Sequence, residues 1–118
     1  MQMEDQQVGA VLVVKPVEQA LDAYAATGFR EKMAGFIQGG HRQIVLDLGA
    51  VQFLDSTGLG AIVSTLKRLD DDGVMVICNA GEMVMDVFRL TRMDRVFPIV
   101  RTLDEAVVVA RDSPRRAA

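Results

Sequence analysis

One stretch of the sequence, residues 44–69, changes its hydrophobic period from that of a strand to that of a helix. Residues 44–48 form a short, mostly apolar run, as expected for a strand that is buried on both faces. Further along, apolar residues recur three and four positions apart, as in an amphipathic helix: Leu59, Ile62, Val63, Leu66 and Leu69. A buried strand that leads directly into a helix is typical of an α/β fold.

The junction between the two periods is formed by the run Asp55-Ser56-Thr57-Gly58. Asp, Ser and Thr side chains accept hydrogen bonds from the first free amides of a helix, so the run predicts a helix N-cap. Gly58 and Gly60 are not needed for a cap, and each costs about 1 kcal/mol relative to Ala in a helix interior. We therefore expect both glycines to expose backbone, so that another molecule can approach the helix start. A phosphate at this point would meet free amides and the positive end of the helix dipole.

The remaining periodic segments alternate between strands and helices. Further strands are predicted at residues 8–17, 74–78 and 96–100, and residues 2–7 are expected to add a short antiparallel strand. Helices are predicted at about 22–38, 57–69, 81–90 and from 102 onward, where Thr102-Leu103-Asp104-Glu105 forms a capping box. This alternation predicts an α/β fold with a mostly parallel sheet and right-handed crossovers. Gly73 is expected to supply the positive φ of the turn after residues 70–72.

Length and composition restrict the possible functions. A chain of 118 residues fits one domain, here expected at residues 1–112, with residues 113–118 as a flexible tail. The net charge of −3 gives no sign of direct nucleic-acid binding, and no apolar run approaches the roughly 18 residues that membrane insertion requires. Cys78 is the only cysteine, so no intramolecular disulfide can form and a reducing cytoplasm is the expected location.

The residues at the strand–helix junction carry a family resemblance. Residues 44–48, followed by Phe53-Leu54-Asp55-Ser56-Thr57-Gly58-Leu59-Gly60, closely resemble the signature of STAS domains, most strongly that of the stand-alone bacterial anti-sigma factor antagonists. The resemblance implies the STAS fold, with a mostly parallel or mixed sheet of four to five strands and about four helices. In those antagonists a partner that is both kinase and anti-sigma factor phosphorylates the serine directly after the aspartate, which corresponds to Ser56.

The resemblance also implies a contact surface for that kinase. We expect the surface to contain Asp22, Asp55, Ser56, Thr57, Gly58, Leu59 and Gly60. Asp22 is an expected N-cap or first-turn acid, and it matches the aspartate that in the family lies beside the phosphorylated serine. The family's usual Gly-Glu-Leu-Asp is here Gln19-Ala20-Leu21-Asp22, so the glycine is absent. Thr57 is the alternative phosphate acceptor.

The resemblance predicts a binding module whose unphosphorylated form holds the anti-sigma factor kinase and so releases a sigma factor. Phosphorylation of Ser56 would end this binding, and a phosphatase would restore it. Two alternatives remain: a STAS subunit of a transporter or lipid-trafficking complex, and a partner-switching regulator of a target other than a sigma factor.

An enzymatic function has little support in the sequence. A serine nucleophile needs a neighbouring base, and His41, the only histidine, is expected near the opposite end of the strand that leads to Ser56. The Gly-x-Ser-x-Gly motif of serine hydrolases and a phosphate-binding loop with its lysine are both absent. We expect no catalytic residue, no cofactor and no metal site.

Overall fold

The computed structural model describes residues 1–113, apart from the side chain of Asp72. Seven strands and four α-helices are present in this part of the chain, in the order β1 Met3–Val8, β2 Val11–Pro16, β3 Ala20–Leu21, α1 Ala23–Gln38, β4 Gln43–Asp47, β5 Phe53–Leu54, α2 Ser56–Leu69, β6 Val74–Cys78, α3 Glu82–Leu90, β7 Ile99–Val100 and α4 Leu103–Asp112. Of the predicted tail at residues 113–118, only Ser113 is described, and its Oγ donates a hydrogen bond to the carbonyl oxygen of Val109 (2.7 Å).

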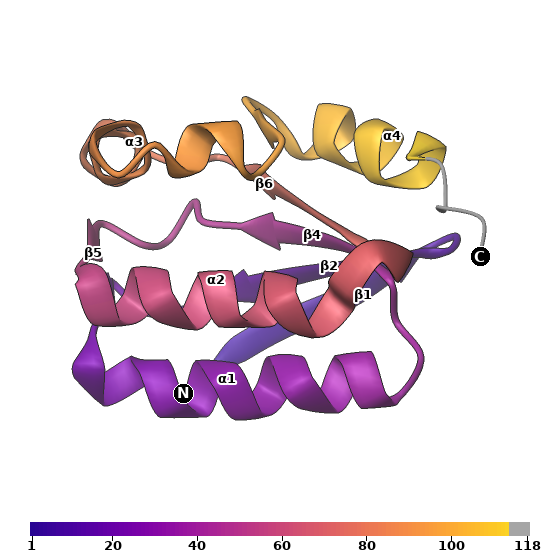
Figure 1. The fold of residues 1–118 in the computed structure, drawn as a ribbon, viewed down its shortest axis with the longest axis horizontal. Coiled ribbons are helices and arrows are strands. Elements are labelled where there is room, and N and C mark those ends of the chain that lie inside the picture. The colour runs from indigo at the N-terminus through magenta and orange to yellow at the C-terminus, as the bar shows by residue number, and fades with distance from the viewer. Residues whose placement is uncertain (114–118) are drawn as a thin grey trace.

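Five of the strands form one mixed sheet in the order β1-β2-β4-β6-β7. The N-terminal strand β1 pairs with β2 in antiparallel fashion, and the other pairs are parallel. This confirms the predicted α/β class and the added antiparallel strand. The helices α1 and α2 lie side by side and begin at the same end of the molecule (Figure 1).

The core consists of two clusters of buried side chains, one on each face of the sheet. Ile44 and Leu46 of β4 belong to the larger cluster, together with the inward residues of α1, α2 and α3. Val45 belongs to the smaller cluster, which Ala106 and Ala110 of α4 complete. All three β4 residues have 0 % exposure, so the predicted burial of this strand on both faces is confirmed.

The prediction of a strand at residues 96–100 was too long, because only residues 99 and 100 pair with β6. The amides of Val96 and Phe97 donate instead to the carbonyl oxygen of Met93 (3.0 and 3.1 Å), which closes a turn. Pro98 has no amide hydrogen, although its carbonyl oxygen accepts a hydrogen bond from Ile77 (2.9 Å).

A second, two-stranded parallel sheet was not predicted. Its strands β3 and β5 pair in the register Ala20 to Phe53 and Leu21 to Leu54. Two residues are too few to show a hydrophobic period, so no sequence pattern announces these strands.

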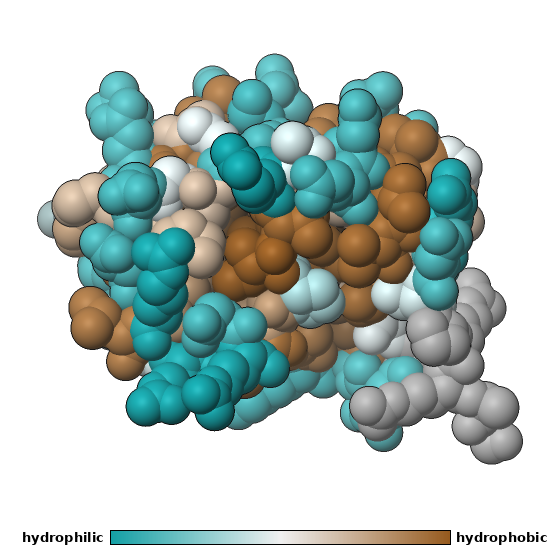
Figure 2. All heavy atoms as spheres, turned by 90° about the horizontal axis from the view of Figure 1, so that it is seen from above, coloured by the Kyte–Doolittle hydropathy of each residue, from teal (hydrophilic) through white to brown (hydrophobic). Residues whose placement is uncertain are grey.

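Apolar side chains are exposed between polar ones on the face of the molecule that carries α3 and α4 (Figure 2). On this side a hollow of about 440 Å³ lies between the start of α3 and the edge strand β7, and its lining includes Met85, Arg89 and Arg101. None of the helices among the described residues is both long and apolar enough to cross a lipid bilayer.

Candidate functional site

Ser56 is the first residue of α2, and its side chain is exposed. It follows β5 by two residues, at the end of the molecule where the parallel strands have their carboxyl termini. Within residues 1–113, no hydrogen bond holds its Oγ. The Ser56 hydroxyl is therefore open to solvent at the strand–helix junction.

Asp55 is the N-cap of α2, as the sequence predicted. Its Oδ1 accepts a hydrogen bond from the amide of Gly58 (2.9 Å), and its carbonyl oxygen accepts one from the amide of Leu59 (2.9 Å). The described residues provide no acceptor for the amides of Ser56 and Thr57. The first turn of α2 therefore has two free donors next to the serine hydroxyl.

Asp22 is the N-cap of α1 and occupies the position that corresponds to Asp55. Its Oδ1 accepts hydrogen bonds from the amides of Tyr24 (3.0 Å) and Ala25 (3.2 Å). Leu21 and Leu54 are paired residues of β3 and β5, and each is followed directly by one of the two caps. The pairing places Asp22 and Asp55 at the same edge of the small sheet, so α1 and α2 begin side by side (Figure 1).

The expected role of Gly58 in opening the helix start to another molecule was wrong. A Cβ at this residue would lie 1.9 Å from the carbonyl oxygen of Leu21 and 3.0 Å from Cδ1 of Leu54. Gly58 is buried and lets the first turn of α2 pack against β3. Gly60 is exposed, and a Cβ there would meet no atom within 4 Å, so this second glycine does leave the surface open.

The seven predicted contact residues therefore differ in what they present to solvent. Ser56, Thr57 and Gly60 are exposed, and Asp22 and Asp55 are partly exposed. Gly58 and Leu59 are buried, although Leu59 still lines a surface groove next to Ser56.

That groove has a volume of about 420 Å³ and lies between α2 and the turn after α3. Ser56 stands at one end and Lys67 lines it three turns further along the helix, and Val63 and Met93 contribute to its mostly apolar lining. Thr91 and Met93 were not among the predicted site residues. No local pattern at residues 91–93 indicates that the chain returns to α2 there.

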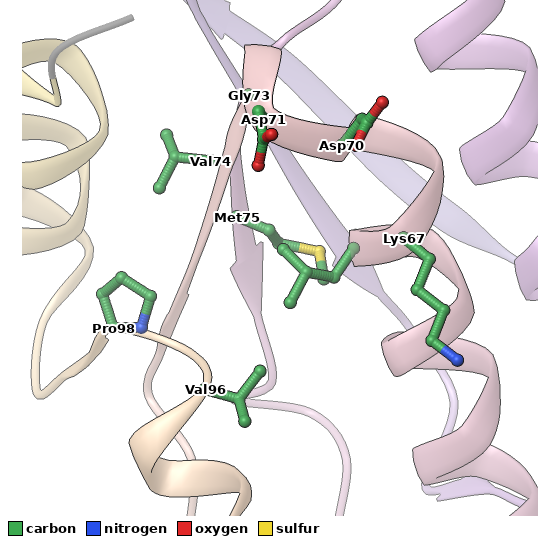
Figure 3. Close-up of a pocket in the computed structure, with 9 residues that line it drawn as sticks. Lys67, Asp70, Asp71, Gly73, Val74, Met75, Val96 and Pro98 are labelled. Carbon is green, nitrogen blue, oxygen red and sulfur yellow. The ribbon is translucent and has the colours of Figure 1, made fainter. Parts of the chain in front are cut away.

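A second hollow of about 430 Å³ lies at the far end of α2, against the start of β6 (Figure 3). Asp70, Asp71 and Lys67 border it, and Lys67 is directed away from Met75 and Val96. Among the described residues there is no group of three or more side chains that could hold a metal ion.

The turn at this far end differs from the prediction. Asp70 has the positive φ (58°), whereas Gly73 is extended (φ −141°). Gly73 is needed for a different reason, because a Cβ there would lie 2.5 Å from the carbonyl oxygen of Arg42.

His41 precedes β4 and packs edge-on against Phe36, with ring centroids 6.2 Å apart. It therefore lies at the opposite end of β4 from Ser56.

Comparison with known proteins identifies the family. The STAS domain family model matches residues 2–106, so the chain belongs to the STAS domain family. The anti-sigma-B factor antagonist of Staphylococcus aureus is 35% identical over 72 residues, which cover 60% of this chain and 67% of that protein. The crystal structure of an anti-sigma factor antagonist from Mycobacterium paratuberculosis has a TM-score of 0.87 and 26% identity, over 94% of each chain.

The fold also occurs in proteins of a different kind. The murine solute carrier 26 family member A9 anion transporter is similar to 92% of this chain, with a TM-score of 0.76 and 19% identity, over 19% of its own length. Since one fold serves several functions, the functional argument depends on the residues of the site.

Proposed function

We propose that this protein is a cytoplasmic anti-sigma factor antagonist whose binding to its partner is switched by phosphorylation of Ser56. The partner is an anti-sigma factor that is also a serine kinase, and a phosphatase reverses the modification. The observation that carries the proposal is the exposed, unbonded hydroxyl of Ser56 at the end of an apolar groove. The relative from Staphylococcus aureus, named an anti-sigma-B factor antagonist, supports the assignment of the partner.

The fold tolerates a phosphate on Ser56. The added group carries about −1.5 to −2 charges at pH 7. It would stand at the start of α2, beside the free amides of Ser56 and Thr57 and the positive end of the helix dipole. Since Ser56 is exposed, no buried side chain has to move. We therefore expect the phosphorylated domain to keep its fold.

The same phosphate is unfavourable once a partner covers the site. It would lose water within an interface that also holds the carboxylates of Asp55 and Asp22, and burying an unpaired charge is costly. Val63 and Met93 offer no counter-charge, and Lys67, the one charged residue of the groove lining, lies three turns from Ser56 along α2. The switch therefore acts by desolvation and repulsion at the contact surface, with little refolding.

The proposal is tested by the variants Ser56→Ala and Ser56→Asp. The host kinase is purified by following its phosphorylation of the chain, and mass spectrometry identifies the residue that it modifies. We expect Ser56→Ala to bind this kinase like the wild type and Ser56→Asp to bind it about tenfold or more weakly, a loss of about 1.4 kcal/mol or more. Equal affinities for the two variants would refute the switch.

Thr57→Val provides the matched control for the acceptor. Thr57 is the neighbouring exposed hydroxyl in the same helical turn. We expect Thr57→Val to be phosphorylated at the wild-type rate, and Ser56→Ala to take up no phosphate. Modification of Thr57 in the wild type would mean that the acceptor has been assigned to the wrong residue.

A further inference from the structure

Exposed hydrophobic side chains concentrate at the end of the molecule where Ser56 lies. Strands β2, β4 and β6 are parallel, so their carboxyl ends meet at one edge, and α1, α2 and α3 all begin after that edge. Among residues 1–113, eight large hydrophobic side chains are exposed, and four of them belong to segments at this end: Val17, Tyr24, Phe53 and Met83.

Three of these side chains stand on elements that adjoin the start of α2. Tyr24 lies in the first turn of α1 and is 97% exposed, Phe53 lies in β5 and is 49% exposed, and Met83 lies in the first turn of α3 and is 66% exposed. The pairing of β5 with β3 connects it to the start of α1, and α3 packs against β5. The three residues therefore follow one another across the end of the molecule, with Ser56 two residues after β5.

The fold itself does not require these side chains. Helix α1 is fixed to the core by Ala26, Phe29, Met33 and Ile37, and α3 by Val84 and Phe88. Leu54 is the buried residue of β5, while its neighbour Phe53 points outward. A tyrosine with 97% exposure buries almost no surface, so it contributes little to stability. Aromatic residues and methionine are enriched at the centres of protein interfaces, where a few of them supply most of the binding energy.

The charges at this end restrict what can cover it. The caps and first turns of α1, α2 and α3 carry Asp22, Asp55 and Glu82 and no basic residue, while Arg89 and Arg101 line the hollow on the β7 side of α3. A second copy of this chain, docked symmetrically, would bring the same carboxylates close to one another. A partner that presents basic side chains between apolar pockets would complement the surface instead.

We propose that Tyr24, Phe53 and Met83 are the apolar anchors of a docking face, here called the carboxyl-end face, and that its occupant is a basic, apolar-pocketed surface of the kinase that modifies Ser56. This inference rests on the function proposed above and extends the contact surface beyond the seven predicted contact residues. Because the anchors lie on elements that adjoin the start of α2, we expect their contact with the partner to exclude water from the Ser56 hydroxyl. A phosphate there would have to lose its hydration, which gives the switch its sensitivity.

The anchors are tested with the full chain and the purified kinase, in the presence of ADP, by titration calorimetry. We expect Tyr24→Ala and Phe53→Ala each to weaken binding by about tenfold or more, as truncation of an interface anchor does. Val8→Ala is the matched control, since Val8 is 38% exposed and pairs with Val11 at the amino end of β2, opposite the carboxyl ends of the parallel strands. We expect its affinity to stay within about twofold of the wild type. Thermal unfolding of each variant shows whether its fold is kept.

Three results would overturn this inference, and only the last would also remove the proposed role of Ser56. If the kinase binds Tyr24→Ala and Phe53→Ala as tightly as the control variant while Ser56→Asp still disrupts binding, the anchors are wrong and the phospho-switch stands. If Tyr24→Ala changes only the oligomeric state measured by light scattering, the occupant is a second copy of the chain. Failure of the wild type to bind or be phosphorylated by any host kinase would remove the proposed function itself.

Discussion

Gly58 and Gly60 provide a matched pair of substitutions with opposite expected signs. Both lie in the first two turns of α2, and replacing either by alanine removes the same backbone freedom from the unfolded chain. At a helix position where the added Cβ does not clash with the rest of the protein, the change stabilises the folded state by about 1 kcal/mol. Gly60 meets this condition, because a Cβ there has no atom within 4 Å. We expect Gly60→Ala to raise the free energy of unfolding.

Gly58→Ala is expected to lower the free energy of unfolding. Its Cβ would lie 1.9 Å from the carbonyl oxygen of Leu21, more than 1 Å inside the 3.0 Å limit that Cβ contacts respect, and 2.7 Å from the carbonyl carbon. The obstacle is backbone of β3, so no rotamer change can relieve it. Overpacking of this kind costs about 1–3 kcal/mol, and the close approach favours the upper value. After the gain in helix propensity, a net loss of about 2 kcal/mol remains.

The two variants should therefore differ by about 3 kcal/mol in stability. Urea unfolding followed by circular dichroism measures this difference, and a slope of about 1.5 kcal/mol per molar urea converts it to about 2 M between the two midpoints. The slopes themselves should agree, since neither change alters how much surface unfolding exposes. A Gly58→Ala midpoint at or above that of the wild type would refute the close packing of α2 against β3.

Two further sets of variants test the caps and the buried thiol. Asp22→Ala and Asp55→Ala each remove the acceptor for the first free amides of a helix, so each should lower the free energy of unfolding measured in urea by about 1 kcal/mol. Asparagine at the same position should restore most of the lost stability, because its side-chain oxygen can also cap the helix. If asparagine restores none of it, the two residues do not act as caps. Burial, with a smaller contribution from the charge of Asp47, raises the pKa of the Cys78 thiol from 9.0 to about 12. Folded protein at pH 8 should therefore resist iodoacetamide until denaturant is added. Because only the unfolded thiol ionises near pH 9, the contribution of Cys78 to the free energy of unfolding is complete below that pH and declines as the pH rises towards 12. The variant Cys78→Val should lack this decline.

Long periodic segments of the sequence predicted the four helices and the inner strands β4 and β6 correctly, whereas the strand predicted at residues 8–17 includes the turn at residues 9–10 that separates β1 from β2. Residues 44–48 are mostly apolar and residues 74–78 are continuously apolar, and each run lies in the sheet interior with both faces covered. The caps were also predictable, because Asp55 and Thr102 act through amides only three residues away. Hydrophobic periodicity and capping both depend on residues that are close in sequence, so both can be recognised without knowledge of the tertiary structure.

The predictions failed where a distant backbone segment decides the local geometry. Gly58 and Gly73 were each assigned a plausible local role, whereas the structure requires them because the carbonyl oxygens of Leu21 and Arg42 come too close for a Cβ. Neither carbonyl can be located from residues next to the glycine. The positive φ after α2 was likewise assigned to glycine, although Asp70 adopts it.

The arrangement of helix starts explains why a recognition surface of this kind is invisible in the sequence. Tyr24, Phe53 and Met83 are far apart along the chain, and of the three only Phe53 lies within the STAS signature. Tyr24 follows β3, Phe53 lies in β5 and Met83 follows β6, and they are brought to one end by the pairing of β3 with β5 and the packing of α3 against β5. The core needs only the inward residue of each first turn, which leaves the outward positions free to vary. Sequence change at these outward positions can therefore alter the choice of partner while Asp55, Ser56 and the fold stay the same.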